Sequence, residues 1–97
     1  MRKIRDLINT EKRVYIVLRT KAMQYRFMSD AEREGITYGD GMKPTERMVD
    51  DIMSLHADGT ICFLGMAGRM LSHFAKEQRV RVDYEKYIDG EEDFYLK

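Results

Sequence analysis

Residues 13–20, RVYIVLRT, contain five consecutive apolar side chains between two arginines. β-branched and aromatic residues dominate this run, and its length is typical of a strand. A strand without polar alternation is usually covered on both faces, as in the middle of a sheet. The stretch therefore predicts a central strand, around which the rest of the fold is arranged.

The segment after this strand has the signals of a helix. The hydroxyl of Thr20 can cap the free amides at the start of a helix over 21–34, and Gly35 can adopt the left-handed conformation that commonly ends one. A short strand over 36–38 follows, so we expect a strand–helix–strand crossover, which is right-handed in nearly all sheets. The apolar stripe of the helix consists of Met23, Phe27 and Ala31.

Two further units are predicted in the second half of the chain. Residues 51–65, DIMSLHADGTICFLG, place an Asp58-Gly59 pair between two apolar runs, which predicts a hairpin with strands at about 52–56 and 60–64. Helical spacing then predicts a second main helix, which packs on the sheet through one face. Its apolar positions are Ala67, Met70, Leu71 and Phe74.

The last segment alternates apolar and charged residues. VRVDYEKYI, residues 80–88, predicts a final long strand, with a turn at Asp89-Gly90 and FYL (94–96) as a returning strand. At the other end of the chain, Ile4, Leu7 and Ile8 indicate a short amphipathic helix. We therefore expect one α/β (α+β) domain over 1–97. It is a two-layer sandwich with a mixed four- to five-stranded sheet, two main helices on one face and a short N-terminal helix.

The composition limits the classes of function. Seventeen basic and seventeen acidic residues cancel, so the general attraction to phosphate that drives non-specific nucleic-acid binding is missing. The single cysteine cannot form an internal disulfide, and no apolar run approaches the ~20 residues that cross a bilayer. The start of the chain does not resemble a signal peptide, so the expectation is a cytoplasmic protein without membrane contact.

Two glycine-containing loops are the candidate ligand sites. In residues 35–46, GITYGDGMKPTE, Gly39 and Gly41 can turn backbone amides toward an anion that Lys43 neutralises. Gly68 and Arg69, between a predicted strand and helix, can do the same. The alternative is that the glycines only permit a tight turn or close packing. If both loops lie at one sheet edge, Lys43 and Arg69 share one phosphate-sized ligand.

No residue set predicts catalysis, a metal or a cofactor. His56 and His73 lack neighbouring ligands at zinc spacing, and we expect both to be ordinary polar side chains. Cys62 lies in the apolar run ICFL and is expected to fill the core. The chain is therefore predicted not to be an enzyme.

Protein binding is the alternative to a ligand site. Eight methionines are many for this length, and methionine forms adaptable contact surfaces as well as core, so Met side chains with Tyr25 or Tyr38 can face a partner protein. The tail YEKYIDGEEDFYLK can pair with a second copy through an edge strand, giving a homodimer.

A resemblance adds context. Residues 31–68 contain an AExxG helix end, a GDGxKPT loop and a DIxxLHxDxTIxxxG segment. This pattern resembles small uncharacterised proteins of phages and other mobile elements of Gram-positive bacteria. The resemblance implies an accessory protein that binds a host or defence protein, as anti-CRISPR inhibitors do. Two alternatives stay open: a sensor or sponge for a phosphorylated or nucleotide ligand, and weak nucleic-acid binding. The basic residues for the latter are Arg2, Lys3, Arg5, Lys12 and Arg13.

Overall fold

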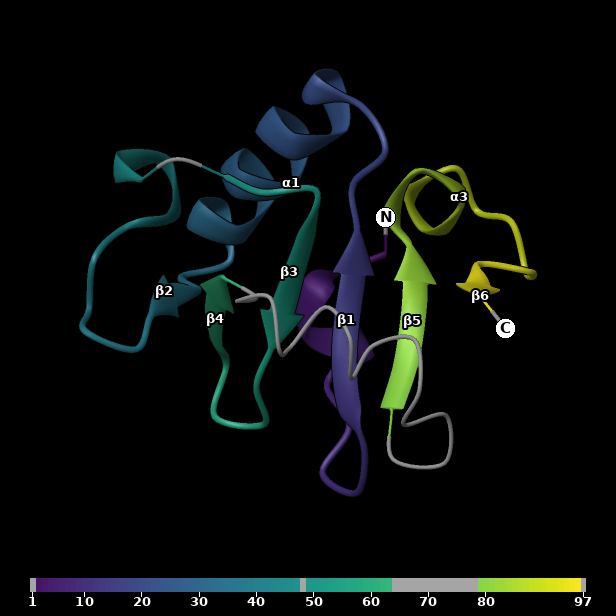
Figure 1. Cartoon of the computed structure of the whole chain (residues 1–97), viewed down its shortest axis with the longest axis horizontal. Helices are drawn as coiled ribbons and strands as arrows, with labels where there is room; N and C mark the ends of the chain where they lie inside the picture. Colours follow the sequence, from purple (N-terminus) through teal and green to yellow (C-terminus); the bar gives the residue numbers. More distant parts are fainter. Residues whose placement is uncertain (1, 48, 64–78, 97) are drawn as a thin grey trace.

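The computed structural model describes residues 2–47, 49–63 and 79–96, which form a mixed sheet with helices against it (Figure 1). Within these residues the sheet has six strands in the order β2-β4-β3-β1-β5-β6, one or two more than expected. The pairs β1–β5 and β2–β4 are parallel, and the others are antiparallel, which confirms a mixed sheet. The strands are β1 (Arg13–Val17), β2 (Thr37–Tyr38), β3 (Ile52–Leu55), β4 (Thr60–Phe63), β5 (Arg79–Asp83) and β6 (Tyr95–Leu96).

Strand β1 is central, as the RVYIVLRT run predicts. It pairs with β3 on one side and β5 on the other. Val14 and Ile16 belong to the core cluster, whereas Tyr15, also buried, lies on the opposite face of the sheet. Regular pairing ends at Val17, three residues before the expected end. The backbone amide of Leu18 instead donates to the carbonyl of Asp51.

Helix α1 (Lys21–Arg33) begins and ends where its capping residues predict. The Thr20 hydroxyl accepts a hydrogen bond from the amide of Met23, and Gly35 has a φ of 75°. Phe27 and Ala31 of the predicted stripe are fully buried. Strand β2 runs parallel to β1 but lies at the far edge of the sheet, so α1 is a crossover that passes two intervening strands.

The hairpin at Asp58-Gly59 is confirmed. Strands β3 and β4 pair with Ser54 opposite Cys62, and Gly59 has a φ of 83°, which an L-residue rarely adopts. The carboxylate of Asp58 accepts hydrogen bonds from the amide and the hydroxyl of Thr60. The turn is therefore closed by its own side chains.

The prediction of one long strand over 80–88 is wrong. Strand β5 ends at Asp83, whose carboxylate accepts a hydrogen bond from the amide of Lys86 and caps helix α3 (Tyr84–Ile88). Tyr84 and Tyr87 are both buried in the core, and a spacing of three places them on one face of a helix but on opposite faces of a strand. The expected FYL return is confirmed in part, because β6 pairs antiparallel with β5.

Two single turns complete the described elements. The predicted N-terminal helix is a 3₁₀ turn, η1 (Ile4–Leu7), with both of its end residues buried, and a second turn, η2 (Pro44–Glu46), follows the glycine-containing loop. The expected helix through Ala67 and Phe74 lies outside the described residues. No helix within the described ranges is long and apolar enough to cross a membrane.

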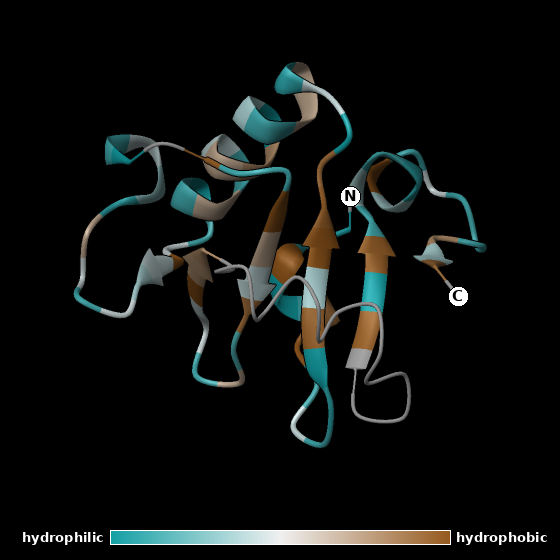
Figure 2. Cartoon of the chain, viewed as in Figure 1, coloured by the Kyte–Doolittle hydropathy of each residue, from teal (hydrophilic) through white to brown (hydrophobic). Residues whose placement is uncertain are grey.

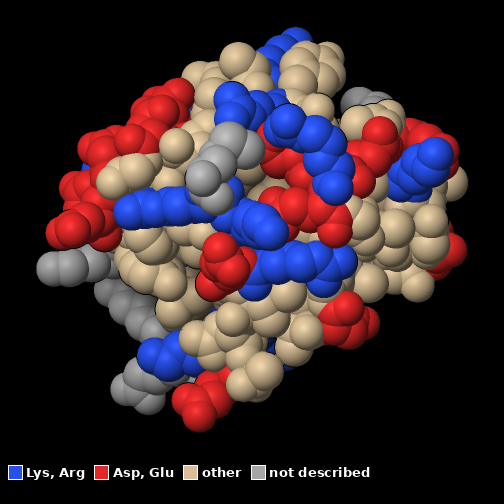
Figure 3. Space-filling model, turned by 180° about the vertical axis from the view of Figure 1, so that it is seen from behind, with Lys and Arg blue, Asp and Glu red and all other residues tan. Residues whose placement is uncertain are grey.

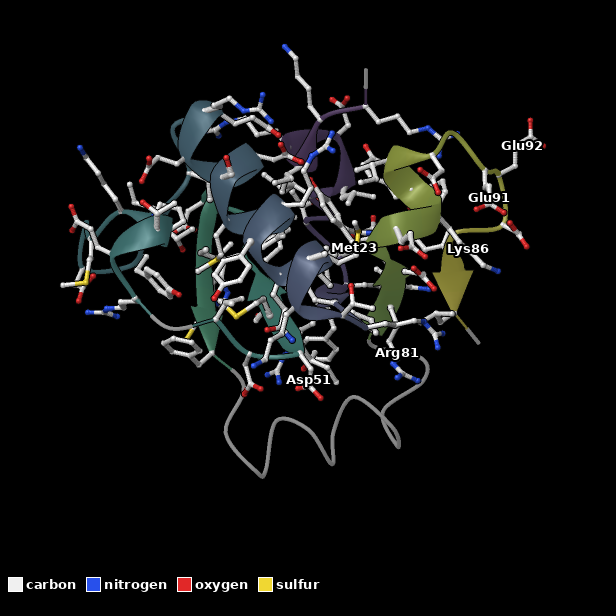
Figure 4. All side chains as sticks on the ribbon, turned by 90° about the horizontal axis from the view of Figure 1, so that it is seen from above. Met23, Asp51, Arg81, Lys86, Glu91 and Glu92 are labelled. Atoms are coloured by element: carbon white, nitrogen blue, oxygen red, sulfur yellow. The ribbon has the colours of Figure 1, made fainter. Side chains whose placement is uncertain are left out.

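The turn η1 and helices α1 and α3 cover the same face of the sheet (Figure 4). Figure 2 shows apolar residues along the inner strands and polar residues in the turns. Cys62 is exposed, which corrects its expected core role. It lies opposite Ser54 in the register, on the face away from the core cluster. That cluster contains Ile4, Leu7, Val14, Ile16, Leu18, Phe27, Met28, Ala31, Ile36, Tyr38, Met53, Leu55, Ile61, Val82, Tyr84 and Tyr87.

Candidate functional site

The loop after β2 is closed by its own hydrogen bonds. The amide of Gly41 donates to the carbonyl of Tyr38 at 2.9 Å, and the amide of Tyr38 donates to the carbonyl of Met42 at 3.0 Å. The carboxylate of Asp40 accepts from the amide of Met42. Gly41 has a φ of 87°, so the turn requires the left-handed conformation at this position. This local network fixes the backbone of Met42 beside β2.

Arg47 connects the loop to the aromatic residues of the sheet edge. Its guanidinium lies 4.7 Å from the centre of the Tyr38 ring, donates to the sulfur of Met42 and forms an ion pair with Asp40. On the other side, the rings of Tyr38 and Phe63 lie 5.4 Å apart. Met42, Arg47, Tyr38 and Phe63 therefore form one continuous chain of contacts, which we call the β2-edge patch.

Two members of the β2-edge patch present large apolar area to solvent. Met42 and Phe63 are each 37% exposed, whereas Tyr38 between them is buried. Among the described residues, no hydrogen-bond partner reaches the buried Tyr38 hydroxyl. Burial raises the pKa of Tyr38 against the opposing influence of Arg47, so the phenol is neutral at physiological pH. The patch is a packed apolar surface with a cation across its middle.

The surroundings of Asp40 stabilise the ionised form of its carboxyl group. The hydrogen bond from the Met42 amide, and then the contact with Arg47, lower the pKa of Asp40 below its usual range. The carboxylate is consequently charged at neutral pH and partly neutralises Arg47. The ammonium of Lys43, in contrast, is exposed and contacts no described acidic residue. Lys43 is thus an exposed cation close in the chain to the β2-edge patch.

The structure separates the predicted site residues into three groups. Gly41 has the positive φ of the tight-turn alternative, and its amide donates to the carbonyl of Tyr38 instead of facing a ligand. Gly39 has no positive φ and lies in open space. Lys43 is exposed immediately before η2. Gly68 and Arg69 lie outside the described residues, so the anion site shared by Lys43 and Arg69 stays a prediction.

Sequence reasoning missed Arg47 and Phe63 as members of a surface. They come from different elements, the end of η2 and the end of β4, and no sequence spacing connects them. Only the parallel pairing of β2 with β4 brings Phe63 beside Tyr38. The residue types carry one weak signal, because an arginine can stack favourably on an aromatic ring, but Arg47 follows Tyr38 by nine residues.

Those residues considered for metal binding or catalysis that the structure describes form no metal-binding cluster. His56 is exposed at the hairpin turn, where its backbone amide donates to the carbonyl of Thr60, and His73 lies outside the described residues. In the part of the chain that the structure describes, no group of three His, Cys, Asp or Glu side chains could hold a metal ion.

Comparisons with known proteins found no family or relative that matches the chain. No protein-family model matches the chain, and no curated protein or solved structure shows significant similarity to it.

Proposed function

We propose that this chain is a non-enzymatic binding protein that contacts a partner protein through the β2-edge patch. The observation that carries the proposal is the continuous contact from Met42 through Arg47 and Tyr38 to Phe63. Met, Arg and aromatic side chains are the types enriched at protein interfaces, and binding energy concentrates in such packed anchors. The closed loop holds these side chains in place before binding, which lowers the entropic cost of association.

The charges around the β2-edge patch indicate the chemistry of the partner. Lys43 is an exposed cation next to Met42, and the guanidinium of Arg47 is only partly neutralised by Asp40. An acidic side chain adjacent to an apolar one would pair with Lys43 while its neighbour packs on Met42 and Phe63. The partner is therefore a protein segment that combines acidic and apolar residues. A mobile-element origin and inhibition of a host defence system stay predictions from the sequence resemblance.

The test is selection of peptides from a random phage-displayed library on the immobilised full chain. Enriched sequences are expected to pair an acidic residue with a large apolar one. Binding of a synthetic enriched peptide should weaken by more than ~10-fold in the double variant Met42→Ser with Lys43→Glu, because both an apolar anchor and the charge complementarity are lost. Unchanged binding in that variant would overturn the proposal.

Tyr25 offers the matched control for this experiment. It is the most exposed of the large hydrophobic residues that the structure describes, at 71%, and it belongs to α1, outside the β2-edge patch. The variant Tyr25→Ser should bind the enriched peptide as the parent chain does. If Tyr25→Ser weakens binding as much as the loop variant, the contact is non-specific.

A homodimer is the second candidate, and a specific observation favours it. Strand β6 lies at the end of the described sheet, and Tyr95 within it is 53% exposed. The neighbouring side chains of Glu91 and Glu92 point away from the body of the molecule (Figure 4). Sedimentation analysis at high micromolar concentration tests this candidate. A dimer that Tyr95→Asp dissociates supports pairing through β6, and a monomer contradicts it.

A further inference from the structure

A second region, separate from the β2-edge patch, is a pocket between the end of α1 and the N-terminal segment. Its volume is about 210 Å³, and five charged side chains line it. Figure 3 shows Lys and Arg side chains interleaved with carboxylates across this helical side of the molecule. The lining residues are Arg2, Lys3, Asp30, Arg33 and Glu34.

Both acidic side chains that line the pocket already have hydrogen-bond or ion-pair partners within the protein. Asp30, which is 4% exposed, pairs with Arg26 and Arg33 and also accepts the hydroxyl of Tyr84. The carboxylate of Glu34 accepts the amides of Ile4 at 2.8 Å and of Arg5 at 3.0 Å. These donors satisfy the carboxylates, so the acidic groups of the pocket do not need a bound cation.

The backbone carbonyls at the C-terminal end of α1 also have hydrogen-bond donors within the protein. The carbonyls of Asp30, Ala31 and Glu32 accept backbone amides from the residues that end the helix, and the carbonyl of Glu34 accepts the Nε of Arg5. A helix C-terminus carries partial negative charge on its free carbonyls. Because these carbonyls already have donors, the negative end of the helix repels an anion less than an uncapped end would.

The cationic side chains keep donors for a ligand. Arg2 is held by the carbonyls of Tyr87, Gly90 and Glu91, and its guanidinium lies over the rings of Tyr87 and Phe94. No described carboxylate forms an ion pair with it, so it keeps its positive charge beside the pocket. Arg33 is 63% exposed and uses one nitrogen for Asp30. The exposed ammonium of Lys3 contacts no described acidic residue.

We propose that this pocket binds a phosphate-sized oxyanion, held by the exposed side chains of Lys3 and Arg33, with Arg2 as a further cation in the lining. The volume exceeds that of phosphate alone, so phosphate monoesters of small molecules belong to the same ligand class. Guanidinium and ammonium groups are the donors that recognise such oxygens. This site is independent of the proposed protein contact, since it shares no residue with the β2-edge patch.

The test is an NMR titration of the ¹⁵N-labelled full chain with inorganic phosphate, and separately with glycerol 3-phosphate, at constant ionic strength. Saturable shifts are expected at the amides of Lys3 and Arg33. Each of Lys3→Gln and Arg33→Gln should weaken binding by about tenfold, the effect of one lost charge-assisted contact. Tighter binding of the monoester assigns the pocket to phosphorylated small molecules, and equal binding assigns it to free phosphate.

Lys21→Gln is the matched control, because it removes the same charge from the opposite end of α1, about 18 Å away along the helix. The affinity of this variant for phosphate should equal that of the parent chain. The absence of saturable shifts, or equal weakening by Lys21→Gln, would overturn the proposal. So would unchanged affinity in Lys3→Gln, an exposed position where the substitution leaves the fold intact.

Discussion

The hydroxyl of Tyr84 donates a 2.6 Å hydrogen bond to the carboxylate of Asp30, which lies 54 residues earlier in the chain. The same carboxylate pairs with Arg26 and Arg33, which lie about one turn away on either side of it along α1. A buried charge is tolerated only when such donors replace its lost hydration. This contact therefore joins α1 to α3 through a satisfied buried carboxylate.

Removal of this contact should destabilise the fold. Tyr84→Phe is expected to lower the free energy of unfolding by about 2 kcal/mol, the range for a hydrogen bond to a charged group. Asp30→Ala should cost at least as much, because it leaves the buried Tyr84 hydroxyl without its acceptor. Urea denaturation of both single variants and the double variant measures the coupling. Tyr25→Phe, at an exposed position, should stay within ~0.5 kcal/mol of the parent chain. Additive effects would contradict direct coupling.

Alanine substitution should affect stability differently at the two glycines of the loop after β2. Gly41 has a φ of 87°, so Gly41→Ala should cost roughly 1–2 kcal/mol, since an L-residue is strained in the left-handed region. Gly39 lacks a positive φ, and an added Cβ meets no atom within 4 Å. Gly39→Ala should therefore be within ~0.5 kcal/mol of the parent chain. Thermal denaturation of the two variants provides the measurement, and equal effects would refute the assigned turn geometry.

Alkaline pH should destabilise the protein through its buried tyrosines. Burial, followed by the charge of Asp6, raises the pKa of Tyr87 to about 12, above the value of ~10 in an unfolded chain. At a pH between these two pKa values, the Tyr87 hydroxyl is deprotonated in the unfolded state while it is still protonated in the folded state. Stability contributed by the neutral phenol is therefore complete below about pH 10 and declines as the pH rises toward 12. The slope is at most ~1.4 kcal/mol per pH unit for one tyrosine.

Urea denaturation at pH 9, 10 and 11 measures this slope. Tyr87→Phe should flatten it, because the variant has no proton to lose at this position. Burial and the hydrogen bond to Asp30 also raise the pKa of Tyr84, so that residue adds a slope of the same sign. An unchanged slope in Tyr87→Phe would show that Tyr87 does not control the alkaline transition.

Much of the described fold follows from local signals. The hydroxyl of Thr20 caps α1, and the Asp58-Gly59 turn joins β3 to β4, because each signal acts over only a few residues. The apolar run from Val14 to Leu18 likewise predicts a strand in the middle of the sheet. Such features depend on capping groups, φ preferences and uninterrupted hydrophobicity, all of which are visible in the sequence.

The candidate site was only partly predictable. Lys43 and the glycine loop stand out by composition, but the contribution of Phe63 depends on β2 lying beside β4. The pocket near Lys3 depends on Glu34 binding the amides of Ile4 and Arg5, a contact across about 30 residues. No sequence periodicity or motif predicts either of these two arrangements.

By itself, the sequence determined the central strand, the capped helix, the hairpin and a mixed α/β sheet, because local preferences are enough to specify them. Only the tertiary structure decided where β5 ends, since Val80, Val82 and Tyr84 alternate as a strand would. Asp83 instead caps α3 and pairs with Arg19, which places Tyr84 against Asp30. Burial of two tyrosines on one helical face outweighs the local alternation, and that burial requires α1 as the opposing surface.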